Sequence, residues 1–239
     1  MNIEDFSLEL SKKTNQMGIK LSKEQIQKLY IYMNLLLDWN EKINLTAITE
    51  PNEVILKHFV DSLSIQQYIK KDLKMIDVGT GAGFPGIPIS ILNSNTEIIL
   101  LDSLNKRINF LNEVVNTLNL DNVKTIHSRV EDAGKEENHR EIYDIATSRA
   151  VASLNVLLEY LLPLVKVGGK CICMKGSSVK EEIEEAKNAI KILGGEIEKI
   201  DEIILPDSDI KRNIIIIKKV KETPLKYPRK AGIPTKEPI

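Results

Sequence analysis

Hydrophobic positions in the first part of the chain recur at helical spacing. Apolar side chains repeat every three or four positions over residues 22–37, and Ser22 and Gln25 form the capping-box pattern that opens a helix. A second helix is expected over residues 51–69, because Pro51 suits a first helical turn and the apolar spacing continues behind it. We therefore predict a helical extension over residues 1–72.

Beyond residue 72 short apolar runs alternate with amphipathic stretches, which is typical of a doubly wound α/β sheet. Strands are expected at residues 75–78, 97–101, 123–127, 144–147, 170–174, 196–204 and 213–218. Helices are expected at residues 87–92, 104–118, 154–165 and 179–193, with glycine pairs at 168–169 and 194–195 as terminators. No helical pattern separates the last two strands. The prediction for residues 73–220 is a seven-stranded, mostly parallel sheet that ends in an antiparallel hairpin.

A glycine-rich loop follows the first expected strand. That strand ends near Asp77, and glycines occupy positions 79, 81, 83 and 86. Glycines at this density sacrifice side-chain packing and conformational entropy, and close approach by a ligand is the usual reason for them. We expect a nucleotide-type cofactor here, with a plain strand-to-helix turn as the alternative.

The loop also fits a dinucleotide fingerprint, because the spacing from Gly81 to Gly86 is Gly-x-Gly-x-x-Gly and Asp102 follows at a suitable distance. A nicotinamide-dependent oxidoreductase is therefore an alternative. Asp77 and Pro85 argue against it, since pyrophosphate requires backbone donors and is repelled by a carboxylate. S-adenosyl-L-methionine carries an ammonium and a sulfonium but no phosphate, so the acidic strand end favours that cofactor.

Ligands of such sheets bind beyond the carboxyl ends of the strands. Asp102 ends the second strand, where a carboxylate can accept both ribose hydroxyls; a helix-capping role is the alternative. Val130 and Glu131 follow the third strand and offer a backbone N–H and an acceptor to an adenine edge. Arg149 follows the fourth strand, and beside a cationic cofactor we expect it to bind acidic side chains of the site or RNA.

Three further positions have two readings each. His58 and Asp61 lie three residues apart on one helix face, and we favour a structural pair over a catalytic one. Phe84, in the glycine loop, either shapes the pocket around the methionine end of the cofactor or packs into the core.

Composition narrows the function classes. The chain has 239 residues, enough for one sizeable core with an appendage. Its 33 Lys and Arg residues balance 34 Asp and Glu residues, so any RNA-binding surface must be local. Cys171 and Cys173 are expected to be reduced and buried, and with the histidines they make no metal-ligand spacing, so no metal is expected. Acidic residues near the N-terminus and the lack of a long apolar stretch favour a cytoplasmic protein without a membrane partner.

The tail over residues 221–239 is basic and rich in proline. It holds five basic residues, two acidic residues and four prolines, for a net charge of +3. We expect an extended strap that either lies against the N-terminal helices or grips phosphate. The candidate RNA-binding residues are Lys106, Arg107, Arg229 and Lys230.

Runs along nearly the whole chain carry a family resemblance. They are residues 39–48 (WNEKINLTAI), 58–63 (HFVDSL), 77–88 (DVGTGAGFPGIP), 101–107 (LDSLNKR), 148–154 (SRAVASL), 175–176 (KG) and 227–234 (YPRKAGIP). With them the chain resembles the 16S ribosomal RNA guanine-N7 methyltransferases, the glucose-inhibited division protein B family of class I S-adenosylmethionine-dependent enzymes. Thr80 replaces the serine frequent in that family, and Ile239 its usual final leucine.

The resemblance implies that Gly79, Phe84, Val130, Glu131 and Arg149 contact S-adenosyl-L-methionine, with Asp102 on the ribose. From the residues themselves we add Asp77 and Gly81 to this set.

The substrate implied by the resemblance is N7 of a single guanine, guanine 527 in the family, in the decoding-region loop of 16S rRNA. Because N7 carries a lone pair and no proton, we expect in-line transfer without a general base and name no catalytic residue. The expected partner is the rRNA or the small ribosomal subunit, and a monomer is expected. A protein that binds RNA without turnover remains the non-enzymatic alternative.

Overall fold

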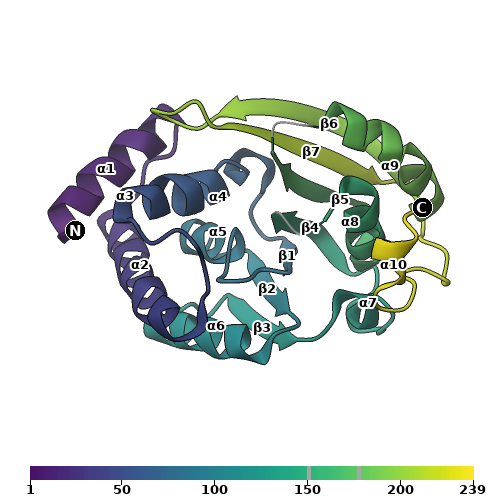
Figure 1. Cartoon of the computed structure of the whole chain (residues 1–239), viewed down its shortest axis with the longest axis horizontal. Coiled ribbons are helices and arrows are strands. Elements are labelled where there is room, and N and C mark those ends of the chain that lie inside the picture. The colour runs from purple at the N-terminus through teal and green to yellow at the C-terminus, as the bar shows by residue number, and fades with distance from the viewer. Residues whose placement is uncertain (150–151, 177–178) are drawn as a thin grey trace.

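The computed structural model describes residues 1–149, 152–176 and 179–239, and Figure 1 shows its arrangement. Ala150 and Val151, which belong to the 148–154 run, and Ser177 and Ser178 lie outside the described residues. A seven-stranded sheet runs through the molecule, with helices on both of its faces.

The strand order of the sheet is β3-β2-β1-β4-β5-β7-β6. The strands are β1 (Lys74–Val78), β2 (Glu97–Asp102), β3 (Val123–His127), β4 (Tyr143–Arg149), β5 (Val165–Lys175), β6 (Gly195–Ile204) and β7 (Lys211–Lys219). The first five strands pair in parallel, and β7 runs antiparallel between β5 and β6. The predicted seven strands and the antiparallel hairpin are confirmed.

Each face of the sheet is covered by its own set of helices. One face carries α1 (Ile3–Gln16), α2 (Lys23–Ile43), α5 (Gly86–Leu92) and α6 (Asn105–Thr117), and the other carries α7 (Val130–Ala133), α8 (Leu154–Leu161) and α9 (Lys180–Leu193). Two buried hydrophobic clusters correspond to these faces. Parallel strands buried on both sides explain why the central strands read as continuous apolar runs. Cys171 and Cys173 are buried and unpaired in β5, as expected.

The N-terminal helices follow the sequence pattern with one omission. The capping box of Ser22 and Gln25 opens α2 as predicted. The second expected helix is a continuous helical stretch made of α3 (Pro51–Val54), a π-helical turn (Ile55–Val60) and α4 (Asp61–Leu63). Helix α1 was not predicted, although Asn2 caps it through the Asp5 N–H and it buries two apolar side chains.

One terminator prediction was wrong. Helix α8 ends at Leu161, a 3-10 turn (Leu162–Leu164) follows, and Gly168 and Gly169 lie inside β5. Pro163 in that turn lacks an N–H, which ends the helix earlier than the glycines would. Gly194 does terminate α9, in the left-handed conformation at φ 89°.

The tail does not lie against the N-terminal helices, so that part of the prediction was wrong. It packs on α8 at the opposite end of the molecule from the N-terminus and contains one short helix, α10 (Ile233–Lys236). The guanidinium of Arg140 donates to the carbonyls of Thr223 and Tyr227, which fixes the start of the tail. Further along the tail, Arg229 pairs with the buried carboxylate of Glu159 in α8, which holds the tail on that face.

Candidate functional site

Two cavities open at the carboxyl ends of β1 and β2. The loop cavity has a volume of about 460 Å³ and is lined by the glycine loop, Asp102 and Arg149. The α7 cavity, of about 230 Å³, is lined by the first residues of α7 and by Tyr160 of α8. Gly79 and Ser103 line both, so the two cavities adjoin.

The glycines of the loop serve different needs. Gly79, Gly81 and Gly83 all have positive φ, at 64°, 62° and 99°, which L side chains rarely adopt. A Cβ on Gly81 would meet only the Gly79 carbonyl, at 4.0 Å, so this position is open toward the loop cavity. A Cβ on Gly83 would lie 2.8 Å from the Tyr32 hydroxyl, and one on Gly86 would lie 2.9 Å from Asp77 Oδ2. Gly81 therefore keeps the cavity clear, while Gly83 and Gly86 allow the loop to pack.

Asp77 holds the glycine loop in place through hydrogen bonds. Its Oδ2 accepts from Thr80 Oγ1 at 2.6 Å and from the Gly86 N–H at 2.8 Å, and the residue is fully buried. Burial raises the pKa of Asp77 to about 7. Oδ1 has no partner in the described part of the chain. Asp77 lines neither cavity, so its direct contact with a cofactor stays a prediction, whereas its hold on the loop is a feature of the structure.

Asp102 joins the loop to β2 and lines the loop cavity. Its Oδ2 accepts from the Gly81 N–H at 2.9 Å and from Arg107 Nη1 at 3.3 Å, and its Oδ1 accepts from the Leu104 N–H at 2.9 Å. A carboxylate has about four lone-pair sites, so these donors leave room for roughly one more. Two ribose hydroxyls therefore fit only if Arg107, the longest of the three contacts, moves away.

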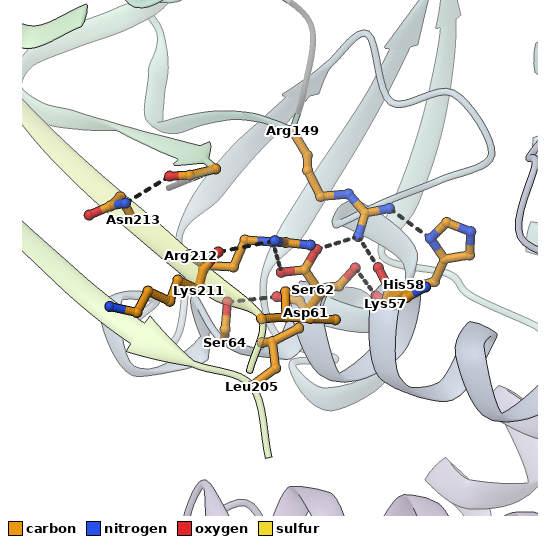
Figure 2. A network of polar contacts seen from close by, with 12 residues as sticks. Lys57, His58, Asp61, Ser62, Ser64, Arg149, Leu205, Lys211, Arg212 and Asn213 are labelled. Carbon is orange, nitrogen blue, oxygen red and sulfur yellow. Dashed lines mark hydrogen bonds and ion pairs between the residues drawn. The ribbon is translucent and has the colours of Figure 1, made fainter. Parts of the chain in front are cut away.

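Arg149 is held by the helical stretch across from the loop (Figure 2). Its Nη1 donates to Asp61 Oδ2 at 3.2 Å and to the Lys57 carbonyl at 3.1 Å, and its Nη2 donates to His58 Nδ1 at 3.2 Å. The expectation that Arg149 binds an acidic side chain of the site is confirmed. Asp61 also accepts from Arg212 Nε of β7 at 3.0 Å, so one buried carboxylate joins two arginines.

His58 is neutral in this arrangement. Burial and the positive charge of Arg149 lower the pKa of His58 to about 3. A guanidinium only donates, so Nδ1 must accept and the ring proton sits on Nε2, which lies 2.8 Å from Thr46 Oγ1. The ring stacks on Phe84 at 4.4 Å, and Phe84 is 5% exposed. His58 and Asp61 thus share Arg149 as a partner. Phe84 packs into the core and also lines the loop cavity, so its core packing is confirmed and its place around the methionine end of the cofactor stays a prediction.

The remaining predicted site residues differ in whether they line a cavity, bind another side chain or are exposed to solvent. Val130 and Glu131 line the α7 cavity together, as their spacing after β3 suggested. Among the RNA candidates, Arg107 binds Asp102 and Arg229 binds the buried Glu159, whereas Lys230 is exposed. Lys106 reaches the carbonyl of Ile43 at 3.5 Å and is otherwise exposed.

The sequence analysis missed Thr46, Tyr160 and Arg212. Thr46 lies in the 39–48 run and lines the loop cavity, so its motif was a usable signal. Tyr160 is the one aromatic in a leucine-rich helix, and Arg212 precedes the apolar run of β7. Neither pattern indicates a site, because their proximity to it arises only from the fold.

Comparison with known proteins decides the family. The model of the GidB family, rRNA small subunit methyltransferase G, matches residues 25–214. The chain belongs to this family. A ribosomal RNA small subunit methyltransferase G from Alkaliphilus metalliredigens is 55% identical over 226 residues, 94% of this chain and 95% of its own length. One from Acetivibrio thermocellus is 57% identical over 223 residues, 93% of this chain and 92% of its own.

Solved structures agree on the fold. A SAM-dependent methyltransferase from Aquifex aeolicus is 18% identical with a TM-score of 0.55, over 73% of this chain and 96% of its own. A 16S rRNA (adenine(1408)-N(1))-methyltransferase variant from Catenulisporales acidiphilia is 12% identical with a TM-score of 0.53, over 64% of this chain and 90% of its own. The predicted class I methyltransferase fold is therefore confirmed.

As a member of the GidB family, the chain is a methyltransferase of small-subunit ribosomal RNA, and S-adenosyl-L-methionine is its cofactor. The nicotinamide-dependent alternative is thereby excluded. The two adjoining cavities fit this cofactor, because Gly81 leaves the loop cavity clear and the two arginines that line it, Arg107 and Arg149, are already paired with the carboxylates of Asp102 and Asp61. Within residues 1–149, 152–176 and 179–239, no helix is long and apolar enough to cross a membrane. The same residues contain no His, Cys, Asp and Glu cluster suited to a metal ion.

Proposed function

We propose that this enzyme methylates N7 of a single guanine, guanine 527 in the family, in the decoding-region loop of 16S rRNA. The transfer is direct and in line, and no side chain acts as a general base. Family membership supports the rRNA substrate, and the resemblance of the motif runs supports the guanine and its position.

The observation that carries the proposal is the state of His58. It is the histidine that lines the loop cavity, yet its Nδ1 accepts from Arg149 and its pKa is lowered to about 3. Such a ring is a poor proton acceptor near neutral pH. Asp102 and Asp61, the carboxylates beside the cavity, are likewise occupied by donors. The possible proton acceptors of this site already accept hydrogen bonds from the protein. Such a site suits a target atom that has a lone pair and no proton, as guanine N7 has.

The cysteines argue against carbon methylation. Methyl transfer to pyrimidine C5 uses a cysteine thiolate as nucleophile. Burial raises the pKa of Cys173 to about 12 and that of Cys171 well above its usual range, so both stay protonated and enclosed in β5.

The chain's own contribution is binding and orientation. The bound cofactor supplies a methyl group on a positively charged sulfur. Gly79, Gly81, Phe84 and Arg149 would hold its methionine end, and Asp102, Val130 and Glu131 its adenosine end. Asp77 acts indirectly, by holding the loop through Thr80 and Gly86. Positioning of two reactants contributes roughly 7–11 kcal/mol, more than the factor of about 10²–10⁴ that a general base adds.

The target guanine must be unpaired or extruded from its stack. N7 lies on the major-groove edge, and in A-form RNA that groove is deep and narrow. The loop cavity is a hollow at the carboxyl ends of the strands, so a base must leave its helix to enter it. A loop base that leaves its stack satisfies this requirement.

The test is transfer of labelled methyl from S-adenosyl-L-methionine to protein-free 16S RNA and, in parallel, to assembled small subunits. Nuclease digestion and mass spectrometry then identify the product. We expect one 7-methylguanosine in the decoding-region loop, and the better substrate shows when in assembly the enzyme acts. Label on another nucleotide contradicts the guanine assignment. Cofactor binding without transfer to either substrate would favour an RNA-binding role without turnover.

A further inference from the structure

A third cavity lies beyond Arg149. This basic cavity has a volume of about 460 Å³ and is lined by residues of the α3–α4 stretch, of β7 and of the carboxyl ends of β4 and β5. His58 and Arg149 line it as well as the loop cavity, so the two spaces adjoin at these side chains. Figure 2 shows the polar network between them, in which Asp61 lies between Arg149 and Arg212.

Positive charge dominates this cavity. Its lining carries four basic side chains, Lys57, Arg149, Lys175 and Arg212, and two acidic ones, Asp61 and Glu182. His58 adds no charge near neutral pH, because its pKa is lowered to about 3. The net charge of the lining is therefore +2.

Ion pairs leave one positive charge of this excess uncompensated, because Glu53, just outside the lining, binds Lys57 at 2.6 Å. The Asp61 carboxylate is shared between Arg149 and Arg212, and Glu182 binds Lys175 at 2.6 Å. Unbalanced positive charge that is partly removed from water is costly, and an anionic ligand relieves this cost. A phosphate of an RNA backbone is such an anion.

The lining also offers apolar surface. Ile48 and Met174 line the same space as the arginines, and Ile48, which is half-buried, is the more accessible of the two. A nucleotide presents a flat apolar base beside a charged phosphate, so it matches a cavity with both kinds of lining better than a small inorganic anion does.

We propose that the basic cavity receives the target nucleotide of the RNA, with Arg212 and Lys57 as its phosphate-binding side chains. This inference rests on the proposed function and assigns the substrate side of the same site. The side chains of Arg212 and Lys57 are 25% and 32% exposed, so both are accessible to a phosphate while remaining attached to the cavity wall. Methyl donor and acceptor then occupy adjoining spaces, as transfer between them requires.

The experiment compares Lys57→Gln and Arg212→Gln with the wild type in methyl transfer to protein-free 16S RNA at saturating cofactor. The control is Lys28→Gln. Lys57 pairs with Glu53 and Lys28 pairs with Glu24, both as i,i+4 helix pairs, but Lys28 lies in α2 outside the basic cavity. KM for RNA, kcat, the cofactor Kd from calorimetry and the salt dependence of RNA binding are measured for each protein.

We expect KM for RNA to rise about tenfold in Arg212→Gln and severalfold in Lys57→Gln. Each variant should also lower the slope of log K against log salt by about 1, the effect of one lost phosphate contact. The cofactor Kd should stay within about twofold of the wild-type value. The control should match the wild type throughout.

Unchanged KM and salt slope in both variants overturn the proposal, as does an equal loss in Lys28→Gln, which would indicate a diffuse electrostatic effect. Lys57→Gln keeps the test decisive if Arg212→Gln unfolds, because the one polar partner of the Lys57 ammonium among the described residues is Glu53 on the surface. A wild type that transfers no methyl to protein-free 16S RNA or to assembled small subunits refutes the proposed function itself. Normal wild-type transfer with unimpaired variants refutes only the assignment of this cavity.

Discussion

At the scale of single residues, two features shape the glycine loop: a buried carboxylate holds it in place, and a glycine without a side chain keeps the cavity beside it clear. Asp77 accepts hydrogen bonds from both ends of the loop, while Gly81 leaves the cavity side clear. The residue types of this loop were predictable from the sequence. Which glycine faces the ligand and which one packs was not, because that depends on neighbours such as Tyr32 and Leu100 from other elements.

Replacement of Gly81 by valine should abolish cofactor binding while the protein stays folded. Gly81 has φ 62°, a conformation that costs a β-branched residue of order 1–3 kcal/mol, and the new side chain would extend into the loop cavity. Calorimetry should show a cofactor Kd raised at least about 100-fold. Gly168→Val is the control, since Gly168 has φ 89° and no atom within 4 Å of its Cβ position but lies outside both cavities. Normal cofactor binding by Gly81→Val would contradict the prediction that the cofactor occupies the loop cavity beside Gly81.

Asp77→Asn should flatten part of the pH dependence of stability. Burial raises the pKa of Asp77 from 3.8 to about 7, with Asp102 raising it further and Arg149 opposing it. An acid with a raised folded-state pKa contributes stability that is fully present below the unfolded pKa, near 4, and is lost as the pH rises through 7. The free energy of unfolding of the wild type should therefore fall relative to Asp77→Asn by up to about 1.4 kcal/mol per pH unit across that window.

Urea denaturation at pH 5 and pH 7.5 measures this difference. The asparagine can still accept from Thr80 and Gly86 through its amide oxygen, so the loop should keep its shape. Parallel stability curves for the two proteins would show that Asp77 is ionised throughout and that burial does not govern its charge.

At the scale of elements, Arg229 makes several hydrogen bonds that tie the tail to α8. Arg229 donates to Glu159 through Nε at 2.9 Å, through Nη2 at 2.6 Å and through its backbone N–H at 2.8 Å. Glu159 is 1% exposed, so this carboxylate depends on Arg229 for its charge partner. The tail's composition predicted a basic strap, but the docking surface was set by a residue 70 positions away.

Arg229→Ala should destabilise the protein by about 3 kcal/mol, because it leaves Glu159 buried without a partner. Its neighbour Lys230 is exposed, and Lys230→Ala should change the free energy of unfolding by less than about 0.5 kcal/mol. Chemical denaturation of both variants measures the contrast. Equal stabilities would mean that the tail is held by other contacts.

Because Lys230 is exposed and Arg229 is held in an ion pair, a change at Lys230 can test RNA binding by the tail without disturbing its structure. Lys230→Glu should weaken binding of 16S RNA and lower its salt slope by about 1, and cofactor binding should be unaffected. Arg229 is unsuitable for this test, since its loss also loosens the tail. An unchanged salt slope for Lys230→Glu would make the tail purely structural.

At the scale of the whole molecule, the N-terminal helices and the sheet share one hydrophobic cluster. It extends from Phe6 and Leu36 in the helical extension to Phe110 in α6 and Ile214 in β7. The Tyr32 hydroxyl of α2 donates to the Ala82 carbonyl in the glycine loop, so the extension supports the site as well as the core. The predicted boundary at residue 72 therefore separates two patterns of secondary structure within a continuous core.

This continuity predicts that the helical extension unfolds together with the sheet. Trp39, the single tryptophan, packs on Phe110 of α6 with ring centroids 5.7 Å apart, so its fluorescence reports on the junction. Fluorescence and far-UV circular dichroism should follow the same denaturation curve. A tryptophan transition at clearly lower denaturant would show that residues 1–72 are an independent unit.

The sequence by itself determined the elements and the chemistry they carry. Apolar spacing set the strands and most helices, and the acidic strand end with its glycines indicated the cofactor, because these properties depend on neighbours along the chain. Only the tertiary structure decided which side chains meet. Arg149, Asp61 and Arg212 come from three separate elements, and Arg229 reaches Glu159 across 70 positions. Such contacts depend on how the faces of the sheet are covered, which no local pattern specifies.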